Sequence, residues 1–279
     1  MAKKTTQELL VELDDRIDSV KESEEFKEIL KFYSRFHNYS YRNTLLIQMQ
    51  KPDATYVAGF NQWKNKFDRH VKEGEEGIAI LAPFTYTKTI TEIKEIEKGD
   101  VIVEKEVEKE IVKTYFKPVY VFDVSQTKGK PLPQLDISIE DEYSKLLQPL
   151  IEFSKDRGVN VQFKNLSAQL KGYYQDNKIV IDEKASITGQ ASILVHELGH
   201  FLLHHETDRE DNKKITKEIK EMEAEAVAFV VMNHFDIEIK SDKYLALYKE
   251  SYNLKESLEY INTISSEIID HCNEELKYI

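Results

Sequence analysis

The sequence predicts an α+β protein built from two domains. Apolar residues at helical spacing alternate along the 279-residue chain with short β-branched runs. A segment with two Pro, one Gly and little apolar content, 125–135, separates the two halves and reads as a linker. Hydrophobic residues make up 41% of the chain, which is enough for real cores. We therefore expect one domain over 1–127 and a second over 136–279.

The first half is expected to hold helices and a long hairpin. Helices are predicted over 6–35, over 41–51 with Ser40 as cap, and around 61–67. Strands are predicted over 78–86 and 118–124. Between these strands, charged and β-branched residues alternate around Gly99-Asp100. This pattern predicts a protruding, solvated hairpin, to which the sequence assigns no function.

The second half is expected to alternate helices and strands before ending in helices. Strands are predicted near 159–164 and 178–182. Helices are predicted near 139–156, 187–205, 215–234 and 241–277, the last of them long and with a possible break. Strands that lead into the helix 187–205 favour a small α+β domain around that helix.

The helix 187–205 carries the sequence His196-Glu197-Leu198-Gly199-His200. Residues four apart lie on one face of a helix, so both imidazoles can bind one metal ion. Glu197 lies beside them and is placed to take the proton of a water molecule and pass it to a leaving amine. This is the His-Glu-x-x-His pattern of zinc hydrolases, and it predicts a zincin-like metallopeptidase domain.

A simple amphipathic helix would also contain polar positions, but three features argue against it. Apolar runs flank the pentad on both sides, so the helix is largely buried. A buried His pair with a carboxylate needs partners, which a metal supplies. Gly199 costs about 1 kcal/mol relative to Ala inside a helix, so its presence indicates that something approaches the backbone closely.

Catalytic zinc needs a third protein ligand and an open position. In one class of zinc hydrolases that ligand lies ten residues after the first His, but here the position is Glu206 and the expected Gly is Leu203. The other, gluzincin-like class takes a Glu from a following helix. We assign Glu221 as this ligand and Glu225 as its neighbour that hydrogen-bonds a ligand His, although the two roles could be exchanged.

The helix around Glu221 has further features. Ala224, Ala226 and Ala228 are small enough to let it pack closely on the His helix, whereas Glu223 points away from the ligand face. A solvated acidic helix is the competing interpretation. An additional donor for the oxyanion is also expected, and the candidates are Tyr173, Tyr174, His204 and His205, of which the last two read as ordinary polar residues at the helix end.

Composition restricts the setting of this chemistry. The single cysteine, Cys272, excludes an intramolecular disulfide and fits a reducing cytoplasm. We find neither a signal peptide nor an apolar run long enough for a membrane helix, and therefore expect a cytoplasmic protein without a membrane partner. The net charge of −12 argues against general nucleic-acid binding, but residues 1–134 are nearly balanced and can form a local basic groove.

Two resemblances add to this reading. The text HELGHFLLH and the downstream EMEAEA helix, within about 140–235, resemble the ImmA/IrrE family of metallopeptidases. That family typically carries Asn or Asp four residues after the liganding Glu, where this chain has Glu225.

The N-terminal half, about 30–127, resembles the N-terminal domain of ArdC-like antirestriction proteins. The matching text is FHNYSYRNTLLIQMQKPDATYVAGFNQWKN, followed by VKEGEEGIAILAPFTY and VYVFDVSQT. The resemblance implies a single-stranded DNA-binding domain fused to a zinc peptidase, of the kind carried by plasmids, integrative elements or phages.

Single strands are held by aromatic faces that stack on bases and by cations that follow phosphates. The first half interleaves these residue types, and the expected DNA-binding residues are Tyr39, Tyr41, Arg42, Asn43, Gln48, Trp63, Lys64, Lys66, Arg69 and Lys72. The competing interpretation is that Trp63 and Phe60 belong to the core and that Lys64 to Lys72 form an ordinary solvated surface.

These features predict a zinc-dependent endopeptidase coupled to single-stranded DNA. Its expected substrate is a DNA-associated protein: a repressor, a restriction factor or the protein itself. The alternative is a non-enzymatic protein that coats single-stranded DNA and has a structural or inactive metal site. A metal-dependent nuclease ranks last, because no carboxylate cluster for a second metal is evident. The sequence leaves the oligomeric state open.

Overall fold

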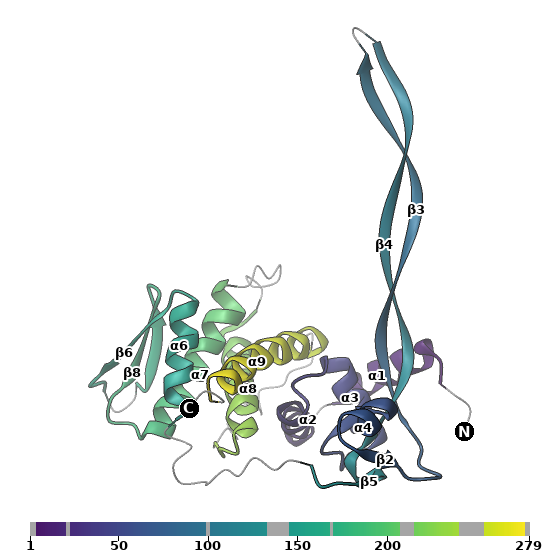
Figure 1. Ribbon diagram of the computed structural model, residues 1–279. Coiled ribbons are helices and arrows are strands. Elements are labelled where there is room, and N and C mark those ends of the chain that lie inside the picture. The colour runs from purple at the N-terminus through teal and green to yellow at the C-terminus, as the bar shows by residue number, and fades with distance from the viewer. Residues whose placement is uncertain are drawn as a thin grey trace.

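The computed structural model describes residues 4–20, 23–98, 101–132, 145–167, 170–206, 215–239 and 254–276. Both halves contain helices and strands, so the predicted α+β class is confirmed. Figure 1 shows a body of helices and short strands from which one long hairpin projects. Within the described residues, no helix is both long and apolar enough to cross a membrane.

The first half contains more elements than the sequence predicted. They are α1 (Thr6–Ser19), α2 (Ser23–Arg35), α3 (Tyr41–Gln50), β1 (Val57–Gly59), α4 (Phe60–Asn65), β2 (Arg69–Val71), β3 (Ile78–Lys98), β4 (Val101–Asp123), the 3₁₀ turn η1 (Val124–Gln126) and β5 (Thr127–Gly129). The predicted helix 6–35 is two helices, α1 and α2, with residues 21–22 outside the described part. The expected cap is confirmed, because the Ser40 hydroxyl accepts the Asn43 N–H at 3.4 Å.

The predicted protruding hairpin is confirmed and is longer than the two predicted strands. β3 and β4 pair antiparallel from Ile78↔Val121 to Lys98↔Val101. β1 adds to the other edge of β4 at the base of the hairpin. The tip at Gly99-Asp100 lies outside the described residues.

The first residues of the predicted linker 125–135 belong to regular elements of the first half. η1 covers its first residues, and β5 pairs antiparallel with β2. The Asp123 carboxylate fixes this corner, since it accepts the backbone N–H groups of Thr55, Tyr56 and Ser125 at 2.8, 3.0 and 2.9 Å. Residues 133–135 lie outside the described part.

The second half contains the predicted strands and one that the sequence did not predict. Its elements are α6 (Leu147–Asp156), β6 (Asn160–Lys164), β7 (Gly172–Gln175), β8 (Lys178–Asp182), α7 (Ile187–Phe201), the π-helical turn η2 (Leu202–Glu206), α8 (Lys217–His234) and α9 (Leu254–Leu276). The strand order is β6-β8-β7, with β6 parallel and β7 antiparallel to β8. The predicted helical positions 139–144 and 241–253 lie outside the described residues.

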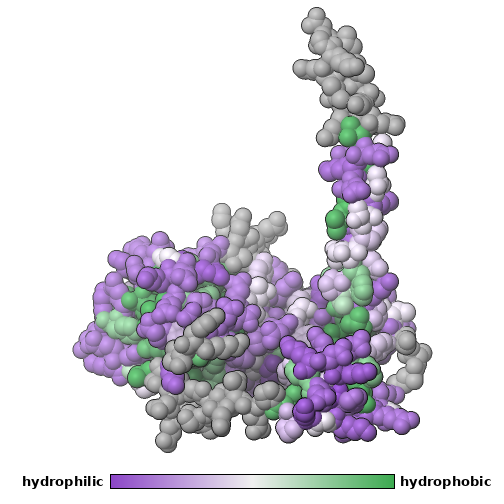
Figure 2. Space-filling model, viewed as in Figure 1, coloured by the Kyte–Doolittle hydropathy of each residue, from purple (hydrophilic) through white to green (hydrophobic). Residues whose placement is uncertain are grey.

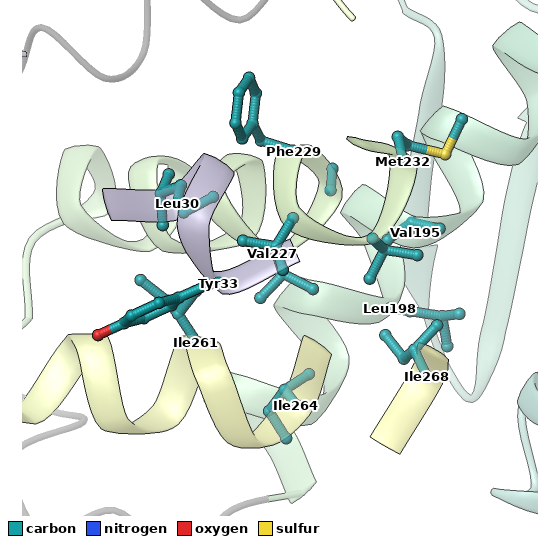
Figure 3. Close-up of a cluster of buried hydrophobic side chains, with 14 of the residues drawn as sticks. Leu30, Tyr33, Val195, Leu198, Val227, Phe229, Met232, Ile261, Ile264 and Ile268 are labelled. Carbon is teal, nitrogen blue, oxygen red and sulfur yellow. The ribbon is translucent and has the colours of Figure 1, made fainter. Parts of the chain in front are cut away.

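The largest hydrophobic core crosses from one half of the chain to the other. Figure 3 shows Leu30 and Tyr33 of α2 in the same cluster as Val227 of α8 and Ile261 of α9. Hydrogen bonds cross the same boundary, since Asn233 Nδ2 donates to Ser34 Oγ at 2.6 Å. The helices of the first half therefore help to support the helix pair α7–α8.

Candidate metal centre

Helix α7 brings His196 and His200 together on one face. The helix begins where Ser186 Oγ accepts the Gly189 N–H at 3.1 Å, and its apolar residues fix it in the main core. One helical turn then separates the two imidazoles, whose Nε2 atoms lie 3.1 Å apart. Two nitrogens at this distance face the same point in space, as binding to a single ion requires.

Glu221 of α8 completes a triangle with the two imidazoles. Its Oε2 lies 3.5 Å from His196 Nε2 and 3.4 Å from His200 Nε2. A tetrahedral ion with three ligands at 2.0–2.1 Å needs those ligand atoms about 3.3–3.4 Å apart. The three side chains therefore fit a zinc-sized ion, and they are the group of described residues whose donor atoms converge closely enough to hold one.

Close packing of α8 on α7 makes this triangle possible. A Cβ on Gly199 would lie 3.0 Å from the Ala224 Cα and 3.3 Å from the Ala224 carbonyl oxygen. The expectations that something approaches the Gly199 backbone and that small residues of α8 permit close packing are both confirmed. A larger side chain at Gly199 would push Glu221 away from the two His.

Glu225 lies one turn after Glu221 and contacts the other nitrogen of His196. Its Oε2 is 3.2 Å from His196 Nδ1. A carboxylate on Nδ1 orients an imidazole and directs Nε2 at the ligand position. This geometry agrees with Glu221 as the metal ligand and Glu225 as its support, and the assignment stays a prediction.

The site is strongly charged. Burial lowers the pKa of His196, but its contacts with Glu221 and Glu225 outweigh burial and raise the pKa to about 9. Burial and the charge of His196 lower the pKa of His200 to about 4. The hydrogen bond with His196 and the nearby His200 outweigh burial and lower the pKa of Glu221 to about 2. Two ligand atoms are therefore already free of protons at neutral pH, while His196 carries one.

Glu197, the predicted general base, is buried beside this triangle. Burial and the charge of Glu221 raise its pKa, partly offset by His196 and by the backbone N–H of Tyr174, which donates to the carboxylate. A carboxylate whose pKa moves toward neutrality can both accept and return a proton.

A cleft of about 650 Å³ opens beside the triangle. Residues 170–174, which run into β7, line the cleft, as does Glu197 of α7. At Gly172 the strand approaches α7 so closely that a Cβ would lie 2.5 Å from Ile193 Cγ2. Gly172 is thus a site residue that the sequence reasoning missed.

The candidate oxyanion donors differ in position. Tyr173 lines the cleft, whereas the Tyr174 hydroxyl donates to Asn177 Oδ1 at 3.0 Å. The expectation that His204 and His205 are ordinary polar residues at the helix end is wrong for His204, which is buried. His205 is exposed and packs on Tyr174.

Glu223 occupies an unexpected place behind the site. Its side chain does point away from Glu221, but it is completely buried rather than solvated. One oxygen lies 3.6 Å from His204 Nε2 and the other accepts a hydrogen bond from Ser257 of α9. The His204 ring in turn lies 5.9 Å from that of His200, between centroids. A polar chain thus connects α9 to the metal-binding face.

Most of the predicted DNA-binding residues support the fold. Trp63 is buried and donates through Nε1 to the Phe122 carbonyl, and Tyr41 is buried with its hydroxyl accepting from Arg42 Nε. These two rings do not offer free faces to bases, so their predicted role is not supported by their positions. Tyr39 is half-buried and donates to the Val57 carbonyl.

The remaining predicted residues are divided. The Asn43 amide both donates to and accepts from the Leu81 backbone, at 2.9 and 2.8 Å. Gln48 and Arg69 donate to backbone carbonyls, as does the exposed Lys72. Lys64 and Lys66 of the α4 region are exposed. The predicted set is therefore divided between residues that hydrogen-bond within the fold and the exposed lysines of the α4 region.

Comparisons with known proteins agree with this arrangement. Residues 1–122 match the model of the N-terminal domain of anti-restriction factor ArdC, and residues 154–259 match that of the IrrE N-terminal-like domain of the M78 peptidases. The uncharacterized protein pXO2-81 of Bacillus anthracis is 27% identical over 88% of this chain and 48% of its own length. The chain thus spans about half the length of that relative.

Among solved structures, the metal-free antirestriction ArdC protein from the R388 plasmid has a TM-score of 0.44 and 18% identity, with 85% of each chain covered. The metal-binding triangle lies inside the segment that matches the IrrE-like model, and most of the hairpin lies inside the segment that matches the ArdC model. The chain thus joins a segment similar to the N-terminal domain of anti-restriction factor ArdC to a segment similar to the IrrE N-terminal-like domain of the M78 peptidases.

Proposed function

We propose that this protein is a zinc-dependent metalloendopeptidase coupled to single-stranded DNA binding. The observation that carries the proposal is the convergence of His196, His200 and Glu221 beside the buried Glu197. The M78-type segment supports peptide hydrolysis, and the ArdC-type segment supports DNA binding and a role in antirestriction on mobile elements. The substrate we propose is a DNA-associated protein: a repressor, a restriction factor or the protein itself.

The chain's own residues divide the work. His196, His200 and Glu221 would hold the ion, and zinc bound there would supply Lewis-acid chemistry toward a water molecule and a peptide carbonyl. Glu197 takes a proton from the attacking water and returns it to the leaving amine nitrogen. Glu225 keeps the His196 ring oriented through Nδ1. Tyr173, which lines the cleft, is the candidate donor to the carbonyl oxygen.

The sheet offers a place for an extended substrate. β7 is an edge strand of the order β6-β8-β7, and the backbone around it lines the cleft. An extended peptide can add to such an edge through main-chain hydrogen bonds, which fixes a scissile bond without demanding one sequence. This favours a peptide substrate over a phosphodiester, for which a second metal-binding group would be expected beside the first.

The test compares the wild type with Glu197→Gln on candidate DNA-associated proteins, with and without single-stranded DNA. We expect both proteins to bind about one zinc ion, measured by elemental analysis, and the variant to cleave about 10²–10⁴-fold more slowly. The His196→Ala/His200→Ala double variant should lose the zinc. Glu206→Gln is the matched control, because Glu206 lies on the same chain segment but pairs with Arg157 at 3.1 Å.

Equal cleavage by the wild type and Glu197→Gln would contradict the peptidase assignment. If Glu197→Gln also protects a single strand from nucleases as well as the wild type does, the non-enzymatic coating role replaces it. Cleavage at the same rate with and without single-stranded DNA would contradict the coupling between DNA binding and peptide hydrolysis, but not the peptidase assignment.

A further inference from the structure

The long hairpin has two chemically different faces over residues 82–92 and 107–117. Directly opposed residues of an antiparallel pair share a face, and successive residues alternate between faces. The register Phe84↔Tyr115 and Tyr86↔Lys113 therefore places these four side chains on one side. The same side carries four lysines in total: Lys88, Lys109, Lys113 and Lys117. We call this side the basic–aromatic face.

The opposite side has another composition. The register Thr85↔Thr114 and Thr87↔Val112 starts a run of threonines that ends with Glu108 and Glu110. Over the same two segments this side carries no lysine and one aromatic ring, Phe116. The positive charge of the hairpin is thus sorted onto one face, which a merely solvated hairpin does not require.

Three rings on the basic–aromatic face form a cluster that remains open to solvent. The ring centroids of Phe84 and Tyr115 are 6.0 Å apart, and those of Tyr86 and Tyr115 are 5.7 Å apart. Phe84, Tyr86 and Tyr115 are 40%, 48% and 38% exposed. Large aromatic side chains bury most of their surface when they serve a core. These rings therefore keep faces that a ligand can cover.

Of the four lysines, Lys117 lies over the rings and Lys109 forms an ion pair. Lys117 Nζ lies 4.9 Å from the centroid of Tyr115 and 5.5 Å from that of Phe84. Lys109 contacts Glu92 at 3.4 Å near the outer end of the described side chains. Within the described part of the chain, Lys88, Lys113 and Lys117 form no ion pair, and all three are exposed. Their charges are available to an anionic partner.

We propose that the basic–aromatic face of the hairpin is the surface that binds single-stranded DNA. This inference rests on the DNA binding within the proposed function and names its location. Unpaired bases stack on aromatic rings, and phosphates follow cations at the edge of the stack. The face offers both, with lysines on either side of the ring cluster. Duplex DNA is a poorer ligand for this face, because its base faces are stacked inside the helix. An acidic protein could pair with the lysines, but it would not supply flat rings to stack on the exposed aromatic side chains.

The position of the hairpin suits this role. Figure 2 shows it standing free of the rest of the surface, so a strand can reach it without displacing another element. From Ala82 to Ile90 the face extends about 25–30 Å at the rise of a β-strand, long enough for several nucleotides. Most of the acidic residues that give the chain its net charge of −12 belong to the other half of the sequence and not to this face.

The experiment measures binding of a fluorescently labelled oligothymidine of about 20 nucleotides by anisotropy, over a series of salt concentrations. An aromatic variant carries Phe84→Ala, Tyr86→Ala and Tyr115→Ala. The charge variant carries Lys88→Gln, Lys113→Gln and Lys117→Gln. The matched control, on the opposite face of the same strands, carries Thr87→Ala, Val112→Ala and Phe116→Ala.

We expect the aromatic variant to bind at least tenfold more weakly than the wild type. The charge variant should lower the slope of log K against log salt by about two, since each phosphate contact on a single strand contributes about 0.7. The control should bind within about twofold of the wild type. Unchanged zinc content and circular dichroism verify that each variant is folded.

Each other result overturns the proposal. Wild-type affinity and salt slope in both face variants would place DNA binding elsewhere, with the proposed function intact. A duplex of the same length that binds more tightly than the single strand would assign the face to another ligand. If the wild type binds no single-stranded DNA, the DNA-binding part of the proposed function fails together with this surface.

Discussion

His196 is the residue at which pH and metal binding meet. Its contacts with two carboxylates raise its pKa to about 9, while the pKa values of His200 and Glu221 lie at about 4 and about 2. Between these limits His200 is a neutral imidazole, Glu221 is a carboxylate, and His196 carries one additional, titratable proton. A metal ion must displace that proton before it can bind all three side chains.

We therefore expect the apparent dissociation constant for zinc to rise about tenfold for each unit that the pH falls between about 8 and 5. The sign follows from the raised pKa, because protonated His196 competes with the ion and gains population as the pH falls. Competition titrations against a chelator of known pH dependence measure this slope.

Glu225→Gln serves as the companion variant, since it removes one of the contacts that raise the pKa of His196. The pH dependence should then weaken in the upper part of the range. A slope near zero or near two for the wild type would contradict the one-proton account.

Sequence spacing predicts this residue arrangement because helical periodicity is local. His196 and His200 share a face by their four-residue separation, and Glu221 and Glu225 follow the same rule one helix later. Burial of Glu223 could not be predicted in this way, because its partner Ser257 comes from α9, distant in the sequence. Likewise, no local pattern shows that Trp63 faces the Phe122 backbone instead of solvent.

At the scale of elements, β7 is the strand of the second half that the sequence did not predict. It has four residues and two tyrosines in place of a β-branched run. The sequence feature that could have indicated this strand is the Asp176-Asn177 pair. Both residues have positive φ, 51° and 58°, as a two-residue hairpin turn requires. Two runs joined by such a pair indicate a hairpin, and with it the edge of the sheet beside Glu197.

The approach of β7 to α7 predicts a graded effect at Gly172. Gly172→Ala would place a Cβ 2.5 Å from Ile193 Cγ2 and 3.1 Å from the Val180 carbonyl oxygen, so the strand must shift. We expect cleavage to fall at least tenfold, because misplacement by about 1 Å can cost 10²-fold, while zinc content stays unchanged.

Adding Ile193→Ala should restore part of the activity, because it removes the closest clashing atom and leaves the tight contact with the Val180 carbonyl and an ordinary one with Glu197 Oε1 at 3.5 Å. Full activity of Gly172→Ala alone would show that the position of β7 does not matter for the reaction. The readout is the cleavage rate of an identified substrate, with elemental analysis as the check on the metal site.

At the scale of the whole molecule, one core joins the two matched segments. Leu30 and Tyr33 of α2 pack in the cluster that also holds Val227 and Phe229 of α8. Periodicity shows which face of each helix is apolar, but it does not show which helix covers it. The sequence boundary at 127–136 stays a prediction, and the contacts across it are not visible in a linear pattern.

We expect a fragment over residues 136–279 to be unstable on its own. Each large apolar side chain that loses its cover costs about 1.5–3 kcal/mol, and α2 covers several, so the loss is comparable to a typical total stability of about 5–15 kcal/mol. Thermal unfolding of the full chain should show one main transition, and the fragment should bind a hydrophobic dye.

Supplying residues 1–135 in trans is the control for this prediction. If the fragment is unstable because α2 and its neighbours no longer cover its core, adding residues 1–135 should restore zinc binding by the fragment. A fragment that unfolds cooperatively at the temperature of the full chain would contradict the shared-core account.

The outer edge of β3 has a consequence for how copies of this protein behave in a crowded solution. The amides of Asn43 and Gln50 pair with the Leu81 and Ala79 backbones, so side chains take the place of a neighbouring strand. The backbone polar groups of Ala79, Leu81 and Pro83 are directed at the same edge of β3. Pro83 follows the two residues that the amides cover, and it has no N–H with which to bind another strand. A bare ladder of this length would invite edge-to-edge aggregation. At the base of the hairpin, the side chains of α3 and the pyrrolidine ring of Pro83 prevent this edge-to-edge aggregation. The two broad faces of the hairpin remain free to meet other molecules.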